Sequence, residues 1–258
     1  MTSFVLETTA KTRTIDHGWC SGTLYDLPEK FYLDTDETCW VTVEKIHQKL
    51  LIKDVDHFDR LFAMHPETRG KALLHKEVEN KRWHQSFLNT PKYNGDSKKS
   101  YMFCGEEDTN KETLPPEFEP FFKYINTFKG WAINGLPIGT VYTYNQVVAN
   151  WYDSDDFIAF HSDYYENMAK NSDVAILSFN RTAVGGSLTN EPPTAVRNFT
   201  IKPIKRFCQN FKYDSVEIPL TDGIEIHMGG KTQEYFKHGV KKCVGAPKRI
   251  SFTFRNYN

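Results

Sequence analysis

The sequence predicts a mainly β protein of the α+β class, with strands arranged as a sandwich or barrel and helices beside them. From residue 138 onward, short runs rich in β-branched and aromatic residues alternate with turn signals. Two segments upstream of that point show helical spacing of apolar residues instead. Aromatic residues make up 14% of the chain, which favours strands and large buried side chains.

The strand signal recurs along the C-terminal half, and one weaker strand-like piece, residues 39–43, lies in the otherwise irregular first 50 residues. A glycine- and proline-containing insertion, residues 183–196, is predicted to be a loop. The predicted strands are VYTYNQVVANWY (141–152), DFIAFH (156–161), DVAILSF (173–179), RNFTIKP (197–203), SVEIPL (215–220), GIEIHM (223–228) and RISFTF (249–254).

Two helices are predicted, over residues 54–63 with Asp54 as the N-cap and over residues 115–129 with prolines in the first turn. Residues 64–100 are polar and predict loops or short exposed strands. In each helix the apolar residues share one face that would pack on a sheet: Val55, Phe58, Leu61 and Phe62 in the first, and Phe118, Phe121, Phe122, Ile125 and Phe128 in the second.

Composition and charge restrict the class of protein. The 258 residues are 39% apolar and 25% charged, as in a soluble globular protein. The net charge of -1 is unlike that of a strongly cationic nucleic-acid-binding protein, so nucleic acid would need a local basic patch. Five cysteines without a CxxC pair favour a reducing, intracellular compartment, nuclear or cytoplasmic. The sequence shows neither a signal-peptide core nor an apolar run of membrane-spanning length, so no membrane contact is expected.

The sequence His161-Ser162-Asp163 is a candidate metal site because it follows a strand-like run. Residues two apart on a strand point to the same face, so the imidazole and the carboxylate could bind one ion. A second histidine downstream would complete the two-histidine, one-carboxylate site typical of non-haem iron(II) oxygenases. His227 and His238 are both candidates for it, and spacing alone does not choose between them.

A second H-x-D sequence, His57-Phe58-Asp59, lies inside the first predicted helix. Residues two apart on a helix point about 200° apart. We therefore expect this copy not to bind a metal ion.

The last predicted strand has two different faces. Ile250, Phe252 and Phe254 make one of them apolar. The other face is polar and would be costly to bury without partners, but it fits a site for a small dianion, because arginine binds carboxylates through paired hydrogen bonds. A solvent-exposed strand face is the alternative. The polar face consists of Arg249, Ser251, Thr253 and Arg255.

Four ordered motifs between about residue 80 and residue 258 resemble the AlkB family of iron(II)- and 2-oxoglutarate-dependent dioxygenases, particularly its nucleic-acid repair branch. They are Asn150-Trp151-Tyr152 followed by His161-Ser162-Asp163, which resembles N-x-Y and H-x-D; MGGKTQEYFKHGV (228–240), which resembles the segment of the distal metal ligand; RISFTFR (249–255), which resembles R-x-N-x-T-x-R; and TPKY (90–93) with Tyr101–Gly105, which resembles the substrate lid.

The resemblance implies a double-stranded β-helix, or jelly-roll, core with flanking helices over residues 81–258. Residues 1–80 are then an N-terminal extension of unknown role, partly packed on the core. The resemblance also selects His238 over His227 as the third metal ligand.

The resemblance assigns roles in binding 2-oxoglutarate. It implies that Arg249, helped by Tyr152 and Ser251, holds the distal carboxylate. It implies that Arg255 and Asn150 act at the end nearer the metal. Ser251 stands where the family usually has asparagine, which would be a longer donor.

The implied cofactors are iron(II), 2-oxoglutarate as cosubstrate, and O2. The implied reaction removes N-methyl or other N-alkyl groups oxidatively from bases such as 1-methyladenine and 3-methylcytosine in DNA or RNA. The protein is expected to act as a monomer on alkylated nucleic acid.

Substrate binding is expected from Tyr101 and Phe103, which could stack on a flipped base or pack in the core, and from Tyr165 and Glu166. Repair members usually carry an acidic residue where this chain has Tyr165. That difference and the 183–196 insertion keep a second hypothesis open, a protein or small-molecule hydroxylase on the same scaffold.

A third hypothesis is a non-enzymatic binding module. The three predicted metal-binding residues and the two arginines, Arg249 and Arg255, argue against it, because a module without turnover does not need all five.

A cluster of lysines near the distal metal ligand could contact phosphates or form a solvated rim. Its members are Lys237, Lys241, Lys242 and Lys248.

Overall fold

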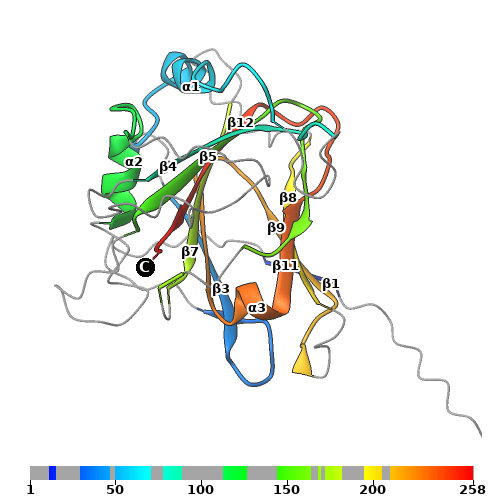
Figure 1. The fold of residues 1–258 in the computed structure, drawn as a ribbon. Helices are drawn as coiled ribbons and strands as arrows, with labels where there is room; N and C mark the ends of the chain where they lie inside the picture. Colours follow the sequence, from blue (N-terminus) through cyan, green and yellow to red (C-terminus); the bar gives the residue numbers. More distant parts are fainter. Residues whose placement is uncertain are drawn as a thin grey trace, which may run out of the picture.

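The computed structural model describes residues 12–15, 30–46, 50–70, 78–88, 113–126, 144–163, 168–169, 172–181, 195–204 and 210–257. These residues form two β-sheets, with two helices beside the larger one (Figure 1). The predicted mainly β fold with flanking helices is confirmed. No helix in the described ranges is long and apolar enough to cross a membrane.

The two sheets are built almost entirely from antiparallel pairs. The larger sheet has the order β2 (Phe31–Tyr32), β3 (Cys39–Lys45), β10 (Ile224–Gly230), β7 (Val174–Asn180), β12 (Arg249–Arg255), β5 (Gln146–Tyr152) and β4 (Trp83–Leu88). The smaller sheet has the order β1 (Thr12–Thr14), β9 (Ser215–Pro219), β8 (Asn198–Pro203), β11 (Phe236–Val240) and β6 (Ile158–His161).

The helices are α1 (Val55–Phe62), α2 (Glu119–Tyr124) and α3 (Thr232–Tyr235). The helix predicted over residues 54–63 is confirmed, and the backbone N–H of His57 donates to the Asp54 side chain at 2.7 Å. The second predicted helix is confirmed but begins later, at Glu119 rather than residue 115. Residues 127–129 of that prediction lie outside the described residues.

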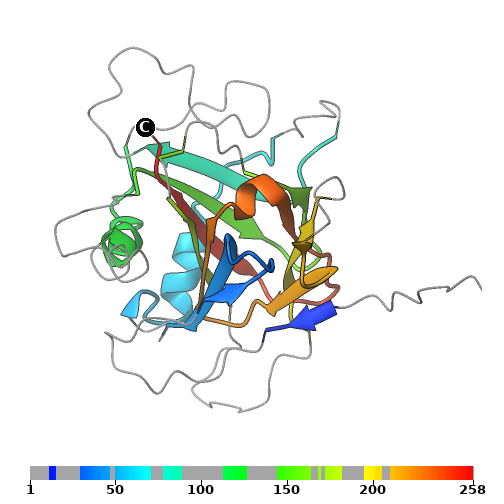
Figure 2. The same ribbon diagram turned by 90° about the horizontal axis from the view of Figure 1, so that it is seen from below.

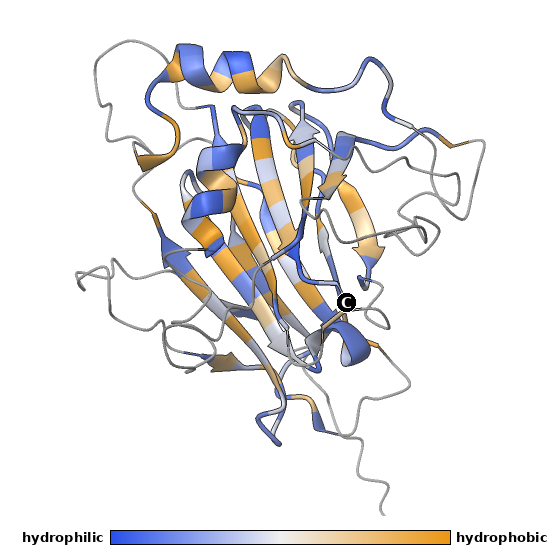
Figure 3. Cartoon of the chain, turned by 60° about the vertical axis from the view of Figure 1, so that its left-hand side comes forward, coloured by the Kyte–Doolittle hydropathy of each residue, from blue (hydrophilic) through white to orange (hydrophobic). Residues whose placement is uncertain are grey.

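Alternation along β12 builds a core on one side of the larger sheet. Ile250, Phe252 and Phe254 are fully buried there against the helices. Phe252 stacks on Phe121 of α2 with ring centroids 4.3 Å apart. Figure 3 shows the resulting banding of apolar and polar residues along neighbouring strands. The apolar face of β12 therefore packs beneath the helices, and its polar face points into the space between the sheets.

The second core fills the space between the two sheets. It joins Ile224, Ile226 and Met228 of β10 to Phe199 and Ile201 of β8. Seen from below, the strands curve around this space, and α3 connects β10 to β11 (Figure 2).

All seven predicted strands in the C-terminal half are present. Residues 64–100 were predicted to be loops or short exposed strands. Strand β4 lies in this range at one edge of the larger sheet, but one of its faces is buried rather than exposed, and residues 71–77 and 89–100 lie outside the described residues. Polar residues on one face of β4 are buried, so its low hydropathy concealed an interior position: Arg82, just before the strand, and His84 and Ser86 within it. Strand β1 pairs with β9, β3 pairs with β10, and β2 pairs with β3; the boundary at residue 80 stays a prediction.

His227 belongs to a buried polar network on the helix side of the larger sheet, away from the space between the sheets. Its Nδ1 lies 2.6 Å from Asp173 Oδ2, and its Nε2 lies 2.7 Å from Glu225 Oε1. The Tyr144 hydroxyl donates to Asp173 at 2.7 Å, and the Tyr124 hydroxyl donates to Glu225 at 3.0 Å. These five residues, called the His227 network below, connect α2 to the sheet.

Candidate active site

A β-bulge in β6 aims His161 into the space between the sheets. His161 is opposite His238 on β11, whereas Ile158 is opposite Val240. Three residue steps on β6 therefore match two steps on β11, and the extra residue turns the chain. As a result Ile158 and His161 line the same pocket, although residues three apart on a regular strand face opposite sides.

Gly239 allows β11 to approach this bulge closely. A Cβ atom at Gly239 would lie 2.9 Å from the backbone oxygen of Ile158. That oxygen belongs to the bulged backbone, so it has little freedom to retreat. A glycine between His238 and Val240 is therefore required by packing.

Asp163 is positioned by tertiary contacts rather than by strand alternation, because β6 ends at His161. Arg255 Nη2 donates to Asp163 Oδ1 at 2.7 Å. The backbone N–H of Asp163 donates to Gln233 Oε1 at 3.1 Å. The end of β12 and helix α3 together hold the carboxylate in a fully buried position.

His161, Asp163 and His238 meet at one point. One possible ligand atom from each residue lies within 4.8 Å of the others. His161 Nδ1 lies 2.9 Å from the carbonyl oxygen of Ala159, and because a carbonyl only accepts, this contact places the proton on Nδ1. His161 Nε2 is then available as a ligand, 3.8 Å from Asp163 Oδ1.

The electrostatics favour the protonation states that bind a metal. Burial lowers the pKa of His161, and it lowers the pKa of His238 to about 3, with the neighbouring His161 contributing. Burial alone would raise the pKa of Asp163, but Arg255 and the two histidines outweigh it and hold that pKa below its usual range. At neutral pH the site therefore offers two neutral imidazoles and one carboxylate, which are the ligand forms that metal ions need.

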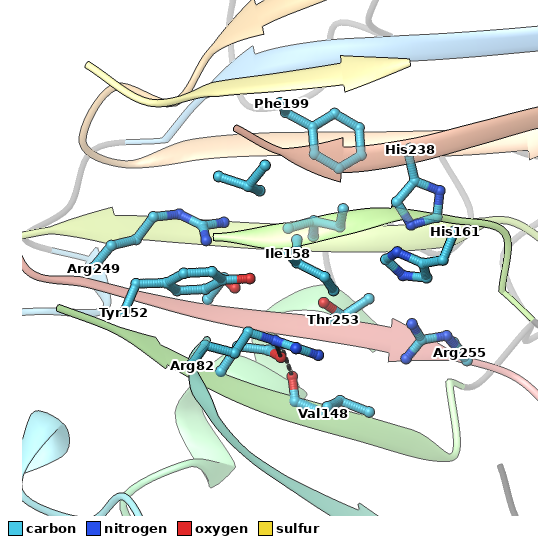
Figure 4. Close-up of a pocket in the computed structure, with 14 residues that line it drawn as sticks. Arg82, Val148, Tyr152, Ile158, His161, Phe199, His238, Arg249, Thr253 and Arg255 are labelled. Atoms are coloured by element: carbon cyan, nitrogen blue, oxygen red, sulfur yellow. Dashed lines mark hydrogen bonds between the residues drawn. The ribbon is translucent and has the colours of Figure 1, made fainter. Parts of the chain in front are cut away.

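Next to this cluster lies a partly open cavity. Figure 4 shows Arg249 and Tyr152 at one end, and His161, His238 and Arg255 toward the other. The cavity lining brings together all five residues predicted to bind the cosubstrate: Asn150, Tyr152, Arg249, Ser251 and Arg255.

Arg249 is a buried cation with unused hydrogen-bonding capacity. Its Nε donates to Ser178 Oγ at 2.8 Å, and its guanidinium carbon lies 4.5 Å from the centre of the Tyr152 ring. Its Nη1 is buried without a hydrogen-bond partner among the described residues. Burial lowers the pKa of Arg249. A carboxylate bound here would supply both the missing acceptor and the missing negative charge.

Arg82 is a cavity residue that sequence reasoning missed. It is 2% exposed, and its Nε donates to Asn150 Oδ1 at 2.8 Å. A guanidinium has no acceptor atom, so this bond fixes the Asn150 amide with its oxygen toward Arg82. The available signal was the polar alternation Arg82, His84, Ser86, which resembles the alternation at Arg249–Arg255.

The cavity is strongly positive. Among the described residues that line it are three arginines, Arg82, Arg249 and Arg255, and no acidic residue. The neighbouring Asp163 carries one negative charge, so these four side chains sum to three minus one, or +2. A dianion is the ligand that would neutralise such a site.

Comparison with known proteins shows similarity to dioxygenases in part of the sequence and in the fold. No family model matches the sequence. The chain is 29% identical over 128 residues to a Rattus norvegicus protein named alpha-ketoglutarate-dependent dioxygenase alkB homolog 3. The match covers 48% of this chain and 40% of that protein. The solved structure of OsALKBH1 shares 14% identity and a TM-score of 0.50, covering 89% of this chain and all of that one.

About half of the chain is thus similar in sequence to an AlkB homologue, and its fold is similar to that of OsALKBH1. A 2OG-Fe(II) oxygenase family oxidoreductase from Burkholderia pseudomallei was also found, with a TM-score of 0.49 and 13% identity, covering 83% of this chain and 84% of that one.

The other candidate metal ligands lie away from the cavity. Asp59, in the second H-x-D sequence, forms an ion pair with Arg181, with Arg181 Nε 2.7 Å from Asp59 Oδ1. His227 lies in its own network on the far face of the larger sheet. The predicted substrate residues lie outside the described residues: Tyr101, Phe103, Tyr165 and Glu166.

Proposed function

We propose that this protein is an iron(II)- and 2-oxoglutarate-dependent dioxygenase that removes N-methyl or other N-alkyl groups from nucleobases in DNA or RNA. One observation carries the proposal. A cluster of two histidines and a carboxylate opens onto a cavity of charge +2 whose far end holds a buried, incompletely partnered arginine. Such a cavity suits a metal together with a dicarboxylate cosubstrate.

His161, Asp163 and His238 would hold iron(II) on one side and leave coordination positions open. The bound metal supplies the oxidising chemistry: O2 and 2-oxoglutarate become succinate and carbon dioxide as one oxygen atom is inserted into a C–H bond of the N-methyl group. The C–N bond of the hydroxymethyl product then breaks: its electron pair returns to the ring nitrogen as the lone pair of the repaired base, and formaldehyde and the hydroxyl proton leave.

The chain's own residues orient the cosubstrate. Arg249 binds its distal carboxylate, with the Tyr152 ring packed against the guanidinium. Arg255 holds Asp163 in its ligand position from the other end of the same strand. Arg82 fixes the Asn150 amide beside the cavity. All six of these side chains are buried, which keeps bulk water away from the reacting groups.

The choice of nucleobase substrates is supported by the motifs in residues 80–258 and by the likeness to the rat dioxygenase. A protein or small-molecule hydroxylase is the second candidate. It is favoured by Tyr165, which stands where repair members of the family usually have an acidic residue.

Mass spectrometry of methylated oligonucleotides tests the proposal. The purified protein is incubated with iron(II), ascorbate, 2-oxoglutarate and oligonucleotides that carry 1-methyladenine or 3-methylcytosine. Loss of the methyl group together with succinate formation is expected. Succinate without demethylation would favour the hydroxylase, and bound metal without any turnover would favour a binding module.

A pair of histidine variants provides the control. His161→Ala should abolish turnover, because it removes one of three metal ligands. His57→Ala removes the histidine of the other H-x-D sequence and should retain wild-type activity. Equal activity of these two variants would contradict the metal assignment.

A further inference from the structure

The outer face of the smaller sheet carries two lysines and one phenylalanine, which we call the outer lysine patch: Lys202 on β8, Lys237 on β11 and Phe160 on β6. Lys202 and Lys237 are exposed, whereas their strand neighbours Ile201 and His238 are buried. The patch therefore lies on the reverse side of the two strands that carry His161 and His238.

The two lysines face each other directly, because Lys237 is the register partner of Lys202 between β11 and β8. Like charges in this position destabilise a sheet, since their Cβ atoms are only about 5 Å apart. Neither lysine forms an ion pair with a described residue. The arrangement has a cost in the isolated protein that a bound anion would remove.

Other lysines of the predicted cluster are already engaged. Lys241 forms an ion pair with Glu217, and Lys242 Nζ lies 3.5 Å from Asp155 Oδ2. Lys248 Nζ lies 4.6 Å from the centre of the Phe62 ring. Within the described part of the chain, Lys202, Lys237 and Lys248 form no ion pair with an acidic residue, and only Lys202 and Lys237 are direct neighbours in a sheet.

Phe160 adds an apolar surface to these cations. It lies in the β6 bulge, is 38% exposed, and has Lys202 Nζ 4.8 Å from its ring centre. The next residue is His161, whose side chain is 27% exposed. An exposed ring and two exposed lysines therefore lie on the outer face of the smaller sheet, with Phe160 and Lys237 each next in sequence to a histidine of the proposed metal site.

We propose that the outer lysine patch binds single-stranded nucleic acid, with Lys202 and Lys237 contacting backbone phosphate and Phe160 stacking on an unpaired base. This inference rests on the proposed function and adds to it the form of the substrate and the surface that receives it. Stacking on a protein ring requires a base free of its partner, which favours a single strand over a duplex. Two opposed ammonium groups suit a phosphate, and an aromatic ring suits a base.

Fluorescence anisotropy with an unmodified thymidine oligonucleotide tests the patch without requiring turnover. The full chain is loaded with manganese(II), and binding is measured at several salt concentrations. The double variant Lys202→Gln/Lys237→Gln removes the patch charges. The double variant Lys241→Gln/Lys242→Gln is the matched control, because it removes two lysines that already have acidic partners.

The patch variant should bind more weakly, and the slope of log affinity against log salt should fall by about 1.4, since each phosphate contact contributes about 0.7 for single strands. Phe160→Ala should weaken single-strand binding on the order of tenfold and leave duplex binding unchanged. The control variant should keep the wild-type affinity. Circular dichroism spectra of all variants should match the wild type, because the substituted side chains are exposed.

Three outcomes would contradict the patch proposal. They are an equal loss of oligonucleotide affinity in the patch and control variants, no loss of affinity in the patch variant, and displacement of the oligonucleotide by polyglutamate at equal affinity. The last result would indicate an acidic protein partner, which needs no stacking surface. If the wild type demethylates and the patch variant binds normally, the patch proposal fails and the proposed function is kept. If binding depends on the patch but no methylated oligonucleotide is turned over, the proposed function fails and the patch proposal is kept.

Discussion

At the scale of single residues, the site depends on buried arginines. Arg249, Arg255 and Arg82 each bring a guanidinium into one cavity, at a desolvation cost that a surface arginine avoids. Two of them already serve neighbours, since Arg255 holds Asp163 and Arg82 holds Asn150. Their joint presence is explained by a ligand of opposite charge.

Arg82 and Asn150 should act as one unit in binding 2-oxoglutarate. Arg82→Met and Asn150→Ala should each weaken binding about tenfold or more, because a buried hydrogen bond to a charged group is lost. The double variant should bind 2-oxoglutarate no more weakly than the weaker-binding of the two single variants, since the two changes break the same contact. Calorimetric titration of 2-oxoglutarate into manganese(II)-loaded protein measures all three.

Arg69→Met is the control for this cycle. Arg69 pairs with Asp156 at 2.6 Å and lies over the Trp83 ring, outside the cavity lining. Its substitution should leave 2-oxoglutarate affinity unchanged. Fully additive effects of the Arg82 and Asn150 substitutions would show that Arg82 does not work through the amide.

At the scale of elements, the β6–β11 pair decides whether the two histidines meet. The bulge in β6 reorients His161, and Gly239 lets β11 approach it. The geometry of the proposed metal site is thus a property of a strand pair, supported by Arg255 at the end of β12.

Gly239→Ala should weaken metal binding more than it weakens the fold. The added methyl group would clash with the Ile158 oxygen, so β6 must shift and carry His161 with it. We expect a loss of about 1–3 kcal/mol in the free energy of unfolding, as for other overpacked sites, and a clear fall in manganese(II) affinity. Thermal unfolding and metal titration measure the two effects.

Gly245→Ala separates these effects. Gly245 has a φ of +74° but has nothing within 4 Å of an added Cβ, so its substitution strains the backbone without touching the site. It should lower stability by about 1 kcal/mol and leave metal affinity unchanged. Wild-type metal affinity in Gly239→Ala would contradict the role given to the bulge.

At the scale of the whole molecule, the His227 network holds α2 against the larger sheet on the side away from the cavity. Burial lowers the pKa of His227, but hydrogen bonds to Asp173 and Glu225 outweigh it and raise that pKa to about 9. An imidazolium between two carboxylates therefore persists in the folded protein at neutral pH.

The stability from His227 should depend on pH. Because the folded pKa lies above the ordinary value of 6.5, this stabilisation is complete below about pH 6.5 and is lost as pH rises toward about 9. The advantage of the wild type over His227→Gln in free energy of unfolding should shrink across that window, by on the order of 3 kcal/mol. Urea denaturation at pH 6, 7.5 and 9 measures the difference.

His57→Gln is the comparison for this titration, because burial lowers rather than raises the pKa of His57. It should show no such loss between pH 6.5 and 9. A constant difference between the wild type and His227→Gln over this range would mean that His227 is not charged in the folded protein.

The amino-acid sequence by itself determined the strand-rich class, the seven C-terminal strands, both flanking helices and the two faces of Arg249–Arg255. These features depend on the spacing of polar and apolar residues, which follows the period of each element. For the same reason, the burial of β4 escaped prediction: its buried face is polar, and periodicity in hydropathy cannot distinguish a polar cavity wall from a solvent-facing surface.

The residue pattern left both His227 and His238 as possible partners of His161. Family resemblance favoured His238, and the tertiary structure places His238 beside His161. Both histidines lie on strands, but on different faces of different sheets, and their distance from His161 depends on long-range strand pairing. The tertiary structure also decided how Asp163 is held, since Arg255 is 92 residues away along the chain. Contacts over such separations arise from register and bulges between strands, which no local pattern encodes.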